Sequence, residues 1–257
     1  MSTPYKADLP SALGSRIASL LRFRPKGVLA VLSTGIPEVD AVAGGLPRGA
    51  ITEICGPASS GRTSLLDAIL AEATGRREVC ALVDTTDTFD PASAAAAGVD
   101  LEQLLWVRCA AHTRHLLQVT DLLAQAGGFG LVALDLGDIP PKDARRIPLN
   151  AWFRFRRAIE NTPTILVVLT QEPCAGSSSS LVLRMNRERE AWSGLPGCSH
   201  LLRGAVLQVE RKKPTHALEC GRRSAECGVE HKPPSRVYSA VPNGTATTAT
   251  FKVRAAG

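Results

Sequence analysis

The chain has 257 residues, a net charge of +6 at pH 7, 44% hydrophobic residues and 21% charged residues. These values are ordinary for a globular protein and exclude a disordered or collagen-like chain. The longest uncharged apolar run, near residues 91–99, is far shorter than the ~20 residues of a membrane helix, so no membrane partner is expected. The length indicates one large α/β domain or one domain with short appendages.

The cysteines and the charges are unevenly distributed. Seven scattered cysteines, and an N-terminus without an apolar segment and cleavage site, predict a cytoplasmic protein without a disulfide framework. Residues 142–257 carry 19 basic and 9 acidic residues, a net charge of +10, whereas residues 1–141 carry −4. This asymmetry is typical of a face that contacts a polyanion, and equally of a solvated basic surface.

The first predicted element is an amphipathic helix over 11–24, followed by a Gly/Pro-rich loop over 33–49 with a helical turn near 38–42. From residue 50 onward, apolar runs alternate with helical segments. Strands are predicted over 50–55, 79–84, 104–108, 130–136 and 164–170, and helices over 63–74, 91–98, 113–126 and 143–161. Short strands are predicted over 204–211, 235–241 and 247–254.

This order of elements predicts an α/β fold. Near-continuous apolar strands separated by helices are typical of a doubly wound, mainly parallel sheet that helices cover on both faces. The last strands predict a C-terminal antiparallel β extension. We expect an N-terminal helix and linker over 1–32, a nucleotide-binding core over 33–211 and a basic β extension over 212–257.

The strongest motif is GPASSGRTS at 56–64, which follows a predicted strand and opens a predicted helix. Its spacing is that of a P-loop, with Arg62 where lysine is usual. Glycines let backbone N–H groups point into one concavity, and the helix N-terminus adds positive charge. The predicted phosphate-binding residues are Gly56, Pro57, Ala58, Ser59, Ser60, Gly61, Arg62, Thr63 and Ser64. A Gly/Ser-rich turn without ligand is the alternative, because guanidinium is larger than ammonium.

A P-loop of this kind uses Mg²⁺, for which Thr63 is one predicted ligand. The second should be an aspartate at the end of another apolar strand. Asp135 fits that position, and Asp84 is the competing candidate. The alternative for either aspartate is a helix N-cap.

Several stretches resemble the RecA-type recombinase family. They are STGIPEVDAVAGGLPRG at 33–49, ITEICGPASSGRTS at 51–64, CALVDTTDTFDP at 80–91, GVDLEQLLWV at 98–107, LVALDL at 131–136 and ILVVLTQ at 165–171. The likeness covers about residues 10–210. It implies a RecA-like core that binds ATP with Mg²⁺, binds single-stranded DNA, and assembles with another copy or another RecA-like subunit in DNA repair, recombination and the SOS response.

The departures from the family pattern concern hydrolysis. Arg62 replaces the P-loop lysine, Thr86 stands at the water-activating glutamate, and Ser93 stands at the aromatic that stacks on adenine. Asp90, near the adenine edge, and Gln171, the phosphate sensor, are kept. The family's C-terminal duplex-binding domain is expected to be absent. This pattern resembles the divergent ImuA-type accessory branch, which works beside a translesion DNA polymerase.

The resemblance also implies two DNA-facing loops, over 137–148 and 172–180. The predicted DNA contacts are Lys142, Arg145, Arg146, Ser177, Ser178, Ser179 and Ser180. The aromatic residues of the helix that follows, at 152–155, could stack on bases, but helical spacing favours a core position for them.

Other functions stay open on the residues alone. The array His216, Cys220, Cys227 and His231 has the residues of a zinc site but not a familiar spacing, which favours an incidental origin. An active DNA-dependent ATPase recombinase predicts a glutamate near residue 86, where the chain has threonine. An unrelated small-molecule kinase predicts a substrate lid and a base near the P-loop, and neither is found in the sequence. The favoured hypothesis is a nucleotide-binding accessory with weak or absent hydrolysis.

Overall fold

The computed structural model of the protein describes residues 30–109, 113–193, 201–213, 241–245 and 247–254. The expected helix over 11–24 and the His/Cys array between 216 and 231 lie outside these residues, as does most of the strand expected over 235–241. None of the helices in the described ranges is long and apolar enough to cross a membrane.

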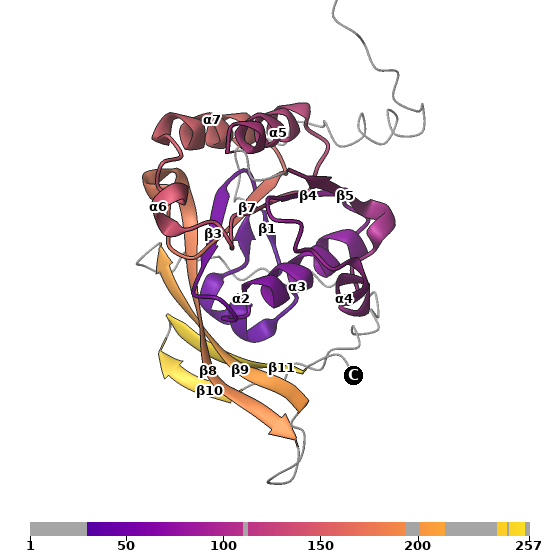
Figure 1. The fold of residues 1–257 in the computed structure, drawn as a ribbon, viewed down its shortest axis with the longest axis vertical. Coiled ribbons are helices and arrows are strands. Elements are labelled where there is room, and N and C mark those ends of the chain that lie inside the picture. The colour runs from indigo at the N-terminus through magenta and orange to yellow at the C-terminus, as the bar shows by residue number, and fades with distance from the viewer. Residues whose placement is uncertain (1–29, 110–112, 194–200, 214–240, 246, 255–257) are drawn as a thin grey trace, which may run out of the picture.

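A nine-stranded sheet forms the centre of the described part, in the order β10-β11-β9-β8-β3-β7-β6-β4-β5 (Figure 1). The strands from β8 to β5 in this order run parallel. They are β3 (Ile51–Cys55), β4 (Cys80–Asp84), β5 (Leu104–Arg108), β6 (Leu131–Asp135), β7 (Ile165–Thr170) and β8 (Ser179–Ser193). The antiparallel strands are β9 (Leu201–Lys213), β10 (Val241–Thr245) and β11 (Thr248–Arg254). The predicted α/β fold and its antiparallel extension are therefore confirmed.

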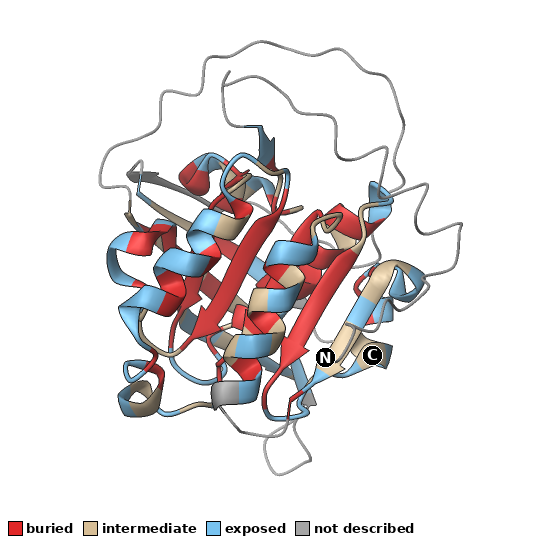
Figure 2. Ribbon diagram, turned by 90° about the horizontal axis from the view of Figure 1, so that it is seen from above, coloured by how far each residue is buried: buried red, intermediate tan, exposed pale blue. Residues whose placement is uncertain are grey.

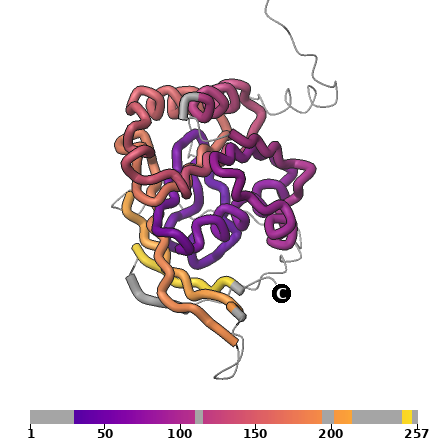
Figure 3. The backbone as a smooth tube through the Cα atoms, viewed as in Figure 1, coloured from indigo at the N-terminus to yellow at the C-terminus, as the bar shows by residue number. Residues whose placement is uncertain are grey.

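Helices cover both faces of the parallel part. α5 (Thr113–Ala126) and α7 (Leu149–Ile159) lie together on one side, and α3 (Arg62–Gly75) lies on the other (Figures 1 and 3). The smaller elements are α2 (Pro37–Ala43), α4 (Pro91–Ala96), α6 (Pro141–Ala144), the 3₁₀ turns η1 (Leu101–Gln103) and η2 (Gly176–Ser178), and the paired strands β1 (Val31–Leu32) and β2 (Leu46–Pro47).

The two sheet faces have separate hydrophobic cores because successive strand residues point in opposite directions. In β6, Leu131 and Ala133 belong to the core on the α3 side, and Val132 and Leu134 belong to the core on the α7 side. All four side chains are fully buried. Figure 2 shows the central strands as buried ribbons beneath helices with exposed outer faces.

The aromatic residues of α7 differ in burial. Trp152 and Phe155 are fully buried, and their rings meet edge to face with centroids 5.9 Å apart. Phe153 is 48% exposed on the opposite face of the helix. The prediction of a core role is thus confirmed for Trp152 and Phe155 and is wrong for Phe153.

Two segments differ from the sequence expectations. The helix expected over 143–161 is two helices, α6 and α7, because Pro148 lacks an N–H group and precedes the first turn of α7. The tract 177–180, expected as a loop, is only partly one, since Ser179 and Ser180 begin β8. This strand lacks a clear apolar signal because its outer half, Asn186–Ser193, is charged and largely exposed.

Candidate nucleotide site

The P-loop connects β3 to α3 through a turn whose geometry requires glycine. A Cβ on Gly56 would lie 2.3 Å from the backbone oxygen of Met185 and 2.6 Å from Ser60 Oγ. Gly61 is left-handed, with φ 88°, and caps the N-terminus of α3, while Ser59 also has positive φ, at 59°. Pro57, Ala58, Ser59 and Thr63 are exposed, so the loop is open to solvent next to the helix N-terminus.

Arg62 is the first residue of α3, and its side chain points away from solvent. It is 8% exposed, and its Nη2 donates a hydrogen bond to the Gly137 oxygen at 3.2 Å. Its Nη1 is buried without a hydrogen-bond partner among the described residues. Burial lowers the pKa of Arg62, while the nearby carboxylates of Asp135 and Asp138 raise it. An unpartnered buried donor at a P-loop is the group that a phosphate oxygen would satisfy.

Gln171, at the end of β7, reaches the same carbonyl. Its Nε2 donates to the Gly137 oxygen at 3.1 Å. The P-loop cation and the predicted phosphate sensor therefore meet at one backbone atom, directly after β6.

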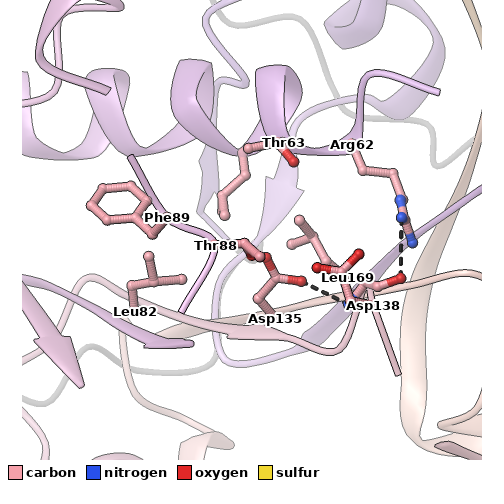
Figure 4. Close-up of a pocket in the computed structure, with 10 residues that line it drawn as sticks. Arg62, Thr63, Leu82, Thr88, Phe89, Asp135, Asp138 and Leu169 are labelled. Atoms are coloured by element: carbon pink, nitrogen blue, oxygen red, sulfur yellow. Dashed lines mark hydrogen bonds between the residues drawn. The ribbon is translucent and has the colours of Figure 1, made fainter. Parts of the chain in front are cut away.

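Two cavities flank the P-loop. The smaller, of about 140 Å³, is polar at one end and is shown in Figure 4. Its lining residues are Arg62, Thr63, Leu66, Leu82, Thr88, Phe89, Asp135, Gly137, Asp138 and Leu169. The larger, of about 340 Å³, lies between the P-loop and strands β8, β9 and β11. Arg187, Glu190, Leu202, Gly204, Ala205, Leu207 and Val253 line it from the strands.

The two candidate magnesium aspartates have different roles. Asp135 lines the smaller cavity, and its Oδ1 accepts the Gly137 N–H at 2.7 Å. Burial raises the pKa of Asp135; the Gly137 hydrogen bond and Arg62 lower it, and neighbouring carboxylates raise it further. Asp84 instead holds its own loop, because its two oxygens accept backbone N–H groups from residues 86–89 and the Trp106 indole N–H.

The position expected for a catalytic glutamate holds no carboxylate. Thr86 is exposed, and its hydroxyl donates to Asp138 Oδ2 at 3.1 Å. Asp87 has a positive φ of 58° and pairs with Arg108 at 3.6 Å. Sequence reasoning placed Asp138 only within a DNA-facing loop and missed that its side chain lines the cavity. Its position three residues after Asp135 is the signal that could have identified it.

Asp90 does not line either cavity. Its carboxylate caps α4 by accepting the backbone N–H groups of Ala92 and Ser93. A further hydrogen bond from the Ser93 hydroxyl is the main reason that the pKa of Asp90 is lowered. Both residues that the family pattern relates to adenine are thus engaged with each other.

The two predicted DNA-facing loops are joined by contacts between their residues. Arg145 pairs with Glu172, and the buried Glu53 of β3 accepts the N–H groups of Cys174 and Ala175 at 2.7 and 2.8 Å. The Arg145–Glu172 pair joins the two loops, and the Glu53 hydrogen bonds hold the segment after Gln171 to β3.

The predicted DNA contacts differ in exposure. Lys142, Arg145 and Arg146 are exposed, and Arg146 pairs with Asp143 at 2.9 Å. In the serine tract, Ser177 and Ser180 are exposed, whereas Ser178 and Ser179 are 1% and 2% exposed. The structure therefore leaves the basic residues and two of the four serines at the surface.

A mainly parallel α/β sheet, a P-loop between β3 and α3, and an aspartate ending β6 define a P-loop nucleotide-binding protein. The family model of the RecA N-terminal domain matches residues 16–143. Protein RecA of Ruegeria pomeroyi is 36% identical over 149 residues, covering 52% of this chain and 43% of that protein. Protein RecA of Deinococcus radiodurans is 30% identical over 181 residues, covering 64% and 50%. These matches place the chain in the RecA-type family.

Coverage limits what these relatives imply. The chain spans about half the length of the curated relatives it matches, as it does for Protein RecA of Rickettsia canadensis, of which it covers 52% at 29% identity. Family membership therefore describes the nucleotide-binding part most directly.

Proposed function

We propose that this chain is a RecA-like protein of DNA repair and recombination that binds ATP at Gly56–Ser64, binds single-stranded DNA, and hydrolyses ATP slowly or not at all. The observation that carries the proposal is the buried guanidinium of Arg62, whose Nη1 has no hydrogen-bond partner in the described part of the chain and lies at a P-loop beside a cavity. Family membership supports the repair role.

The two cavities beside the P-loop offer space for the phosphates and the base of a nucleotide. The phosphates would lie on the open P-loop at the α3 N-terminus, where the helix dipole favours negative charge. The strand side of the larger cavity offers Leu207 and Val253 as apolar surface for a base. The sequence also predicts Mg²⁺ at Thr63 and Asp135, which line the same cavity as Arg62.

Slow hydrolysis follows from the residue at position 86. A threonine hydroxyl cannot act as a general base at neutral pH, and Thr86 already donates to Asp138. Gln171, at the end of β7, links the nucleotide site to the loop that follows it through its hydrogen bond to Gly137. Binding of ATP alone can therefore change that loop, without cleavage of the phosphate bond.

The paired loops support DNA binding. Lys142, Arg145 and Arg146 are exposed on one loop, and Ser177 and Ser180 on the other, with the Arg145–Glu172 pair between the loops. Cations and small polar residues of this kind contact the phosphate backbone without reading sequence.

We also propose an accessory role, with protein partners and a domain organisation to match. The resemblance to the ImuA-type branch supports a cytoplasmic accessory in the damage response that works with a translesion DNA polymerase and with another copy or another RecA-like subunit. The proposed organisation is an N-terminal segment over 1–32, a nucleotide-binding core over 33–211, and a basic β extension over 212–257. The antiparallel ladders β8–β9, β9–β11 and β10–β11, which continue the sheet beyond its parallel strands, support the β extension.

One observation favours a second function, an active DNA-dependent ATPase recombinase. The Asp138 carboxylate lines the small cavity, where it could replace the missing glutamate as the base.

The test combines binding and turnover on the full chain. Fluorescence anisotropy with a labelled single-stranded oligonucleotide, with and without ATP, should show binding that weakens steeply with salt. Hydrolysis should stay slow with DNA present. Strong DNA-stimulated turnover that Asp138→Asn abolishes would favour the recombinase instead.

A further inference from the structure

We propose that Arg62 takes the place of the divalent cation in this P-loop, so that nucleoside phosphates bind as free anions rather than as magnesium complexes. The inference rests on the proposed nucleotide site and concerns what that site recognises. Its basis is the position of the Arg62 guanidinium as well as the presence of arginine in place of the P-loop lysine.

The guanidinium is fixed on the side of the site where a metal is expected. Its Nη2 donates to the Gly137 oxygen, and a Cβ on Gly137 would lie 3.3 Å from Nη2 and 3.4 Å from Cζ. The planar group therefore packs against the backbone two residues after Asp135. An arginine at this position thus extends past the loop to the end of β6.

Magnesium fits poorly beside this group. Mg²⁺ requires octahedral oxygen coordination at about 2.0–2.1 Å and usually keeps several waters. Its two expected ligands, Thr63 and Asp135, line a cavity of about 140 Å³ whose wall also includes the Arg62 side chain. A buried guanidinium repels a second cation in a region of low dielectric constant. Asp135 Oδ1 is moreover already an acceptor for the Gly137 N–H.

Arg62 retains a donor for an anion. Nη1 is buried without a partner among the described residues, although the residue is more than nine-tenths buried. A guanidinium presents several donors in a fixed plane, so one nitrogen can hold the Gly137 carbonyl while the other binds a phosphate oxygen. The same side chain then supplies both the positive charge and the link to β6 that a metal ion would supply.

The role of Asp135 changes with the cation. A metal-binding aspartate strengthens nucleotide binding, whereas an aspartate without a metal repels phosphate. Asp135→Asn keeps an oxygen that can accept the Gly137 N–H, so it removes the charge with little change of shape. The variant therefore separates the two accounts by the sign of its effect.

The experiment is isothermal titration of the full chain with ATP, in buffer with Mg²⁺ and in buffer with EDTA. The dissociation constant of the wild type should differ less than ~3-fold between the buffers, and Arg62→Lys should bind ~10-fold or more tightly with Mg²⁺ than with EDTA. Asp135→Asn should bind ATP at least as tightly as the wild type in both buffers. Arg76→Lys, on the exposed end of α3, is the matched control and should behave as the wild type. Melting temperatures report whether each variant is folded.

The results that would overturn this inference differ from those that would overturn the proposed nucleotide site. Wild-type binding in Mg²⁺ but not in EDTA, or weaker binding by folded Asp135→Asn, overturns this inference and leaves the proposed nucleotide site intact. Absence of ATP binding in both buffers overturns the proposed site and this inference with it.

Discussion

The hydroxyl of Thr86 donates a hydrogen bond to the carboxylate of Asp138, with 3.1 Å between Oγ1 and Oδ2. Thr86 follows β4 and Asp138 follows β6, two strands that lie side by side. The bond brings together the position where the family pattern has a base and a carboxylate that lines the smaller cavity. Because Thr86 is the donor, this oxygen of Asp138 is engaged before any water binds.

Restoring the glutamate alone is expected to have little effect. Thr86→Glu should leave ATP turnover low, because Arg62 still occupies the side of the site next to β6. In the Arg62→Lys background the same change should raise turnover, since a general base typically contributes ~10²–10⁴-fold. Release of phosphate from ATP measures both variants. An equal rise in both backgrounds would show that Arg62 does not limit hydrolysis.

The basic loop after β6 should set the affinity for DNA. Arg145→Ala with Arg146→Ala is expected to weaken single-strand binding by a similar factor for every sequence, and to reduce the slope of log K against log salt by about 1 for each arginine. Anisotropy titrations at several salt concentrations measure the slope. Arg77→Ala, at an exposed arginine beyond the end of α3, is the control. An unchanged slope in the double variant would exclude the loop as the contact.

Glu53 is expected to stabilise the loop after Gln171. Glu53→Ala removes the acceptor of two N–H groups, those of Cys174 and Ala175, and each unsatisfied buried group costs about 1–3 kcal/mol. Urea unfolding should show this loss, and hydrogen exchange should accelerate at 172–176. Glu53→Gln, which keeps an acceptor oxygen, should lose less. Equal losses in the two variants would contradict a hydrogen-bonding role.

The buried thiols predict a loss of stability at alkaline pH. Burial raises the pKa of Cys55 from 9.0 to about 11 and that of Cys80 to about 12. The unfolded chain therefore loses these protons first, so the free energy of unfolding should fall as the pH rises from about 9 toward 11. Urea unfolding at pH 8, 9 and 10 measures the fall. It should be smaller in the Cys55→Ala, Cys80→Ala double variant, and an identical fall would exclude the thiols as its source.

The sequence predicts most of the fold because its strands are continuous apolar runs. The expected bounds of β3, β4, β6 and β7 agree with the structure to within one residue at each end, since a strand covered on both faces has few polar interruptions. The outer half of β8 is not predictable in this way, because its alternating arginine and glutamate residues are paired with β9 and carry no apolar signal.

The sequence predicts only the part of the site whose residues are close together along the chain. The P-loop spacing identifies Gly56, Gly61 and Arg62, because the phosphate cradle is a local structure. The contact of Arg62 with Gly137 joins residues 75 positions apart, and it exists only because β3 and β6 both flank β7. No pattern in the sequence reports where a long side chain ends, so the contact between Arg62 and Gly137 is visible only in the structure.

The proposed P-loop binds nucleotide and barely cleaves it. A single-turnover measurement with radiolabelled ATP and excess full chain, with single-stranded DNA present, reports both properties at once. Binding should occur at about tens of micromolar, and ADP should form far more slowly than ~1 per second, the low end of typical enzymes. ADP formation faster than this, or a complete lack of bound ATP, would contradict the account.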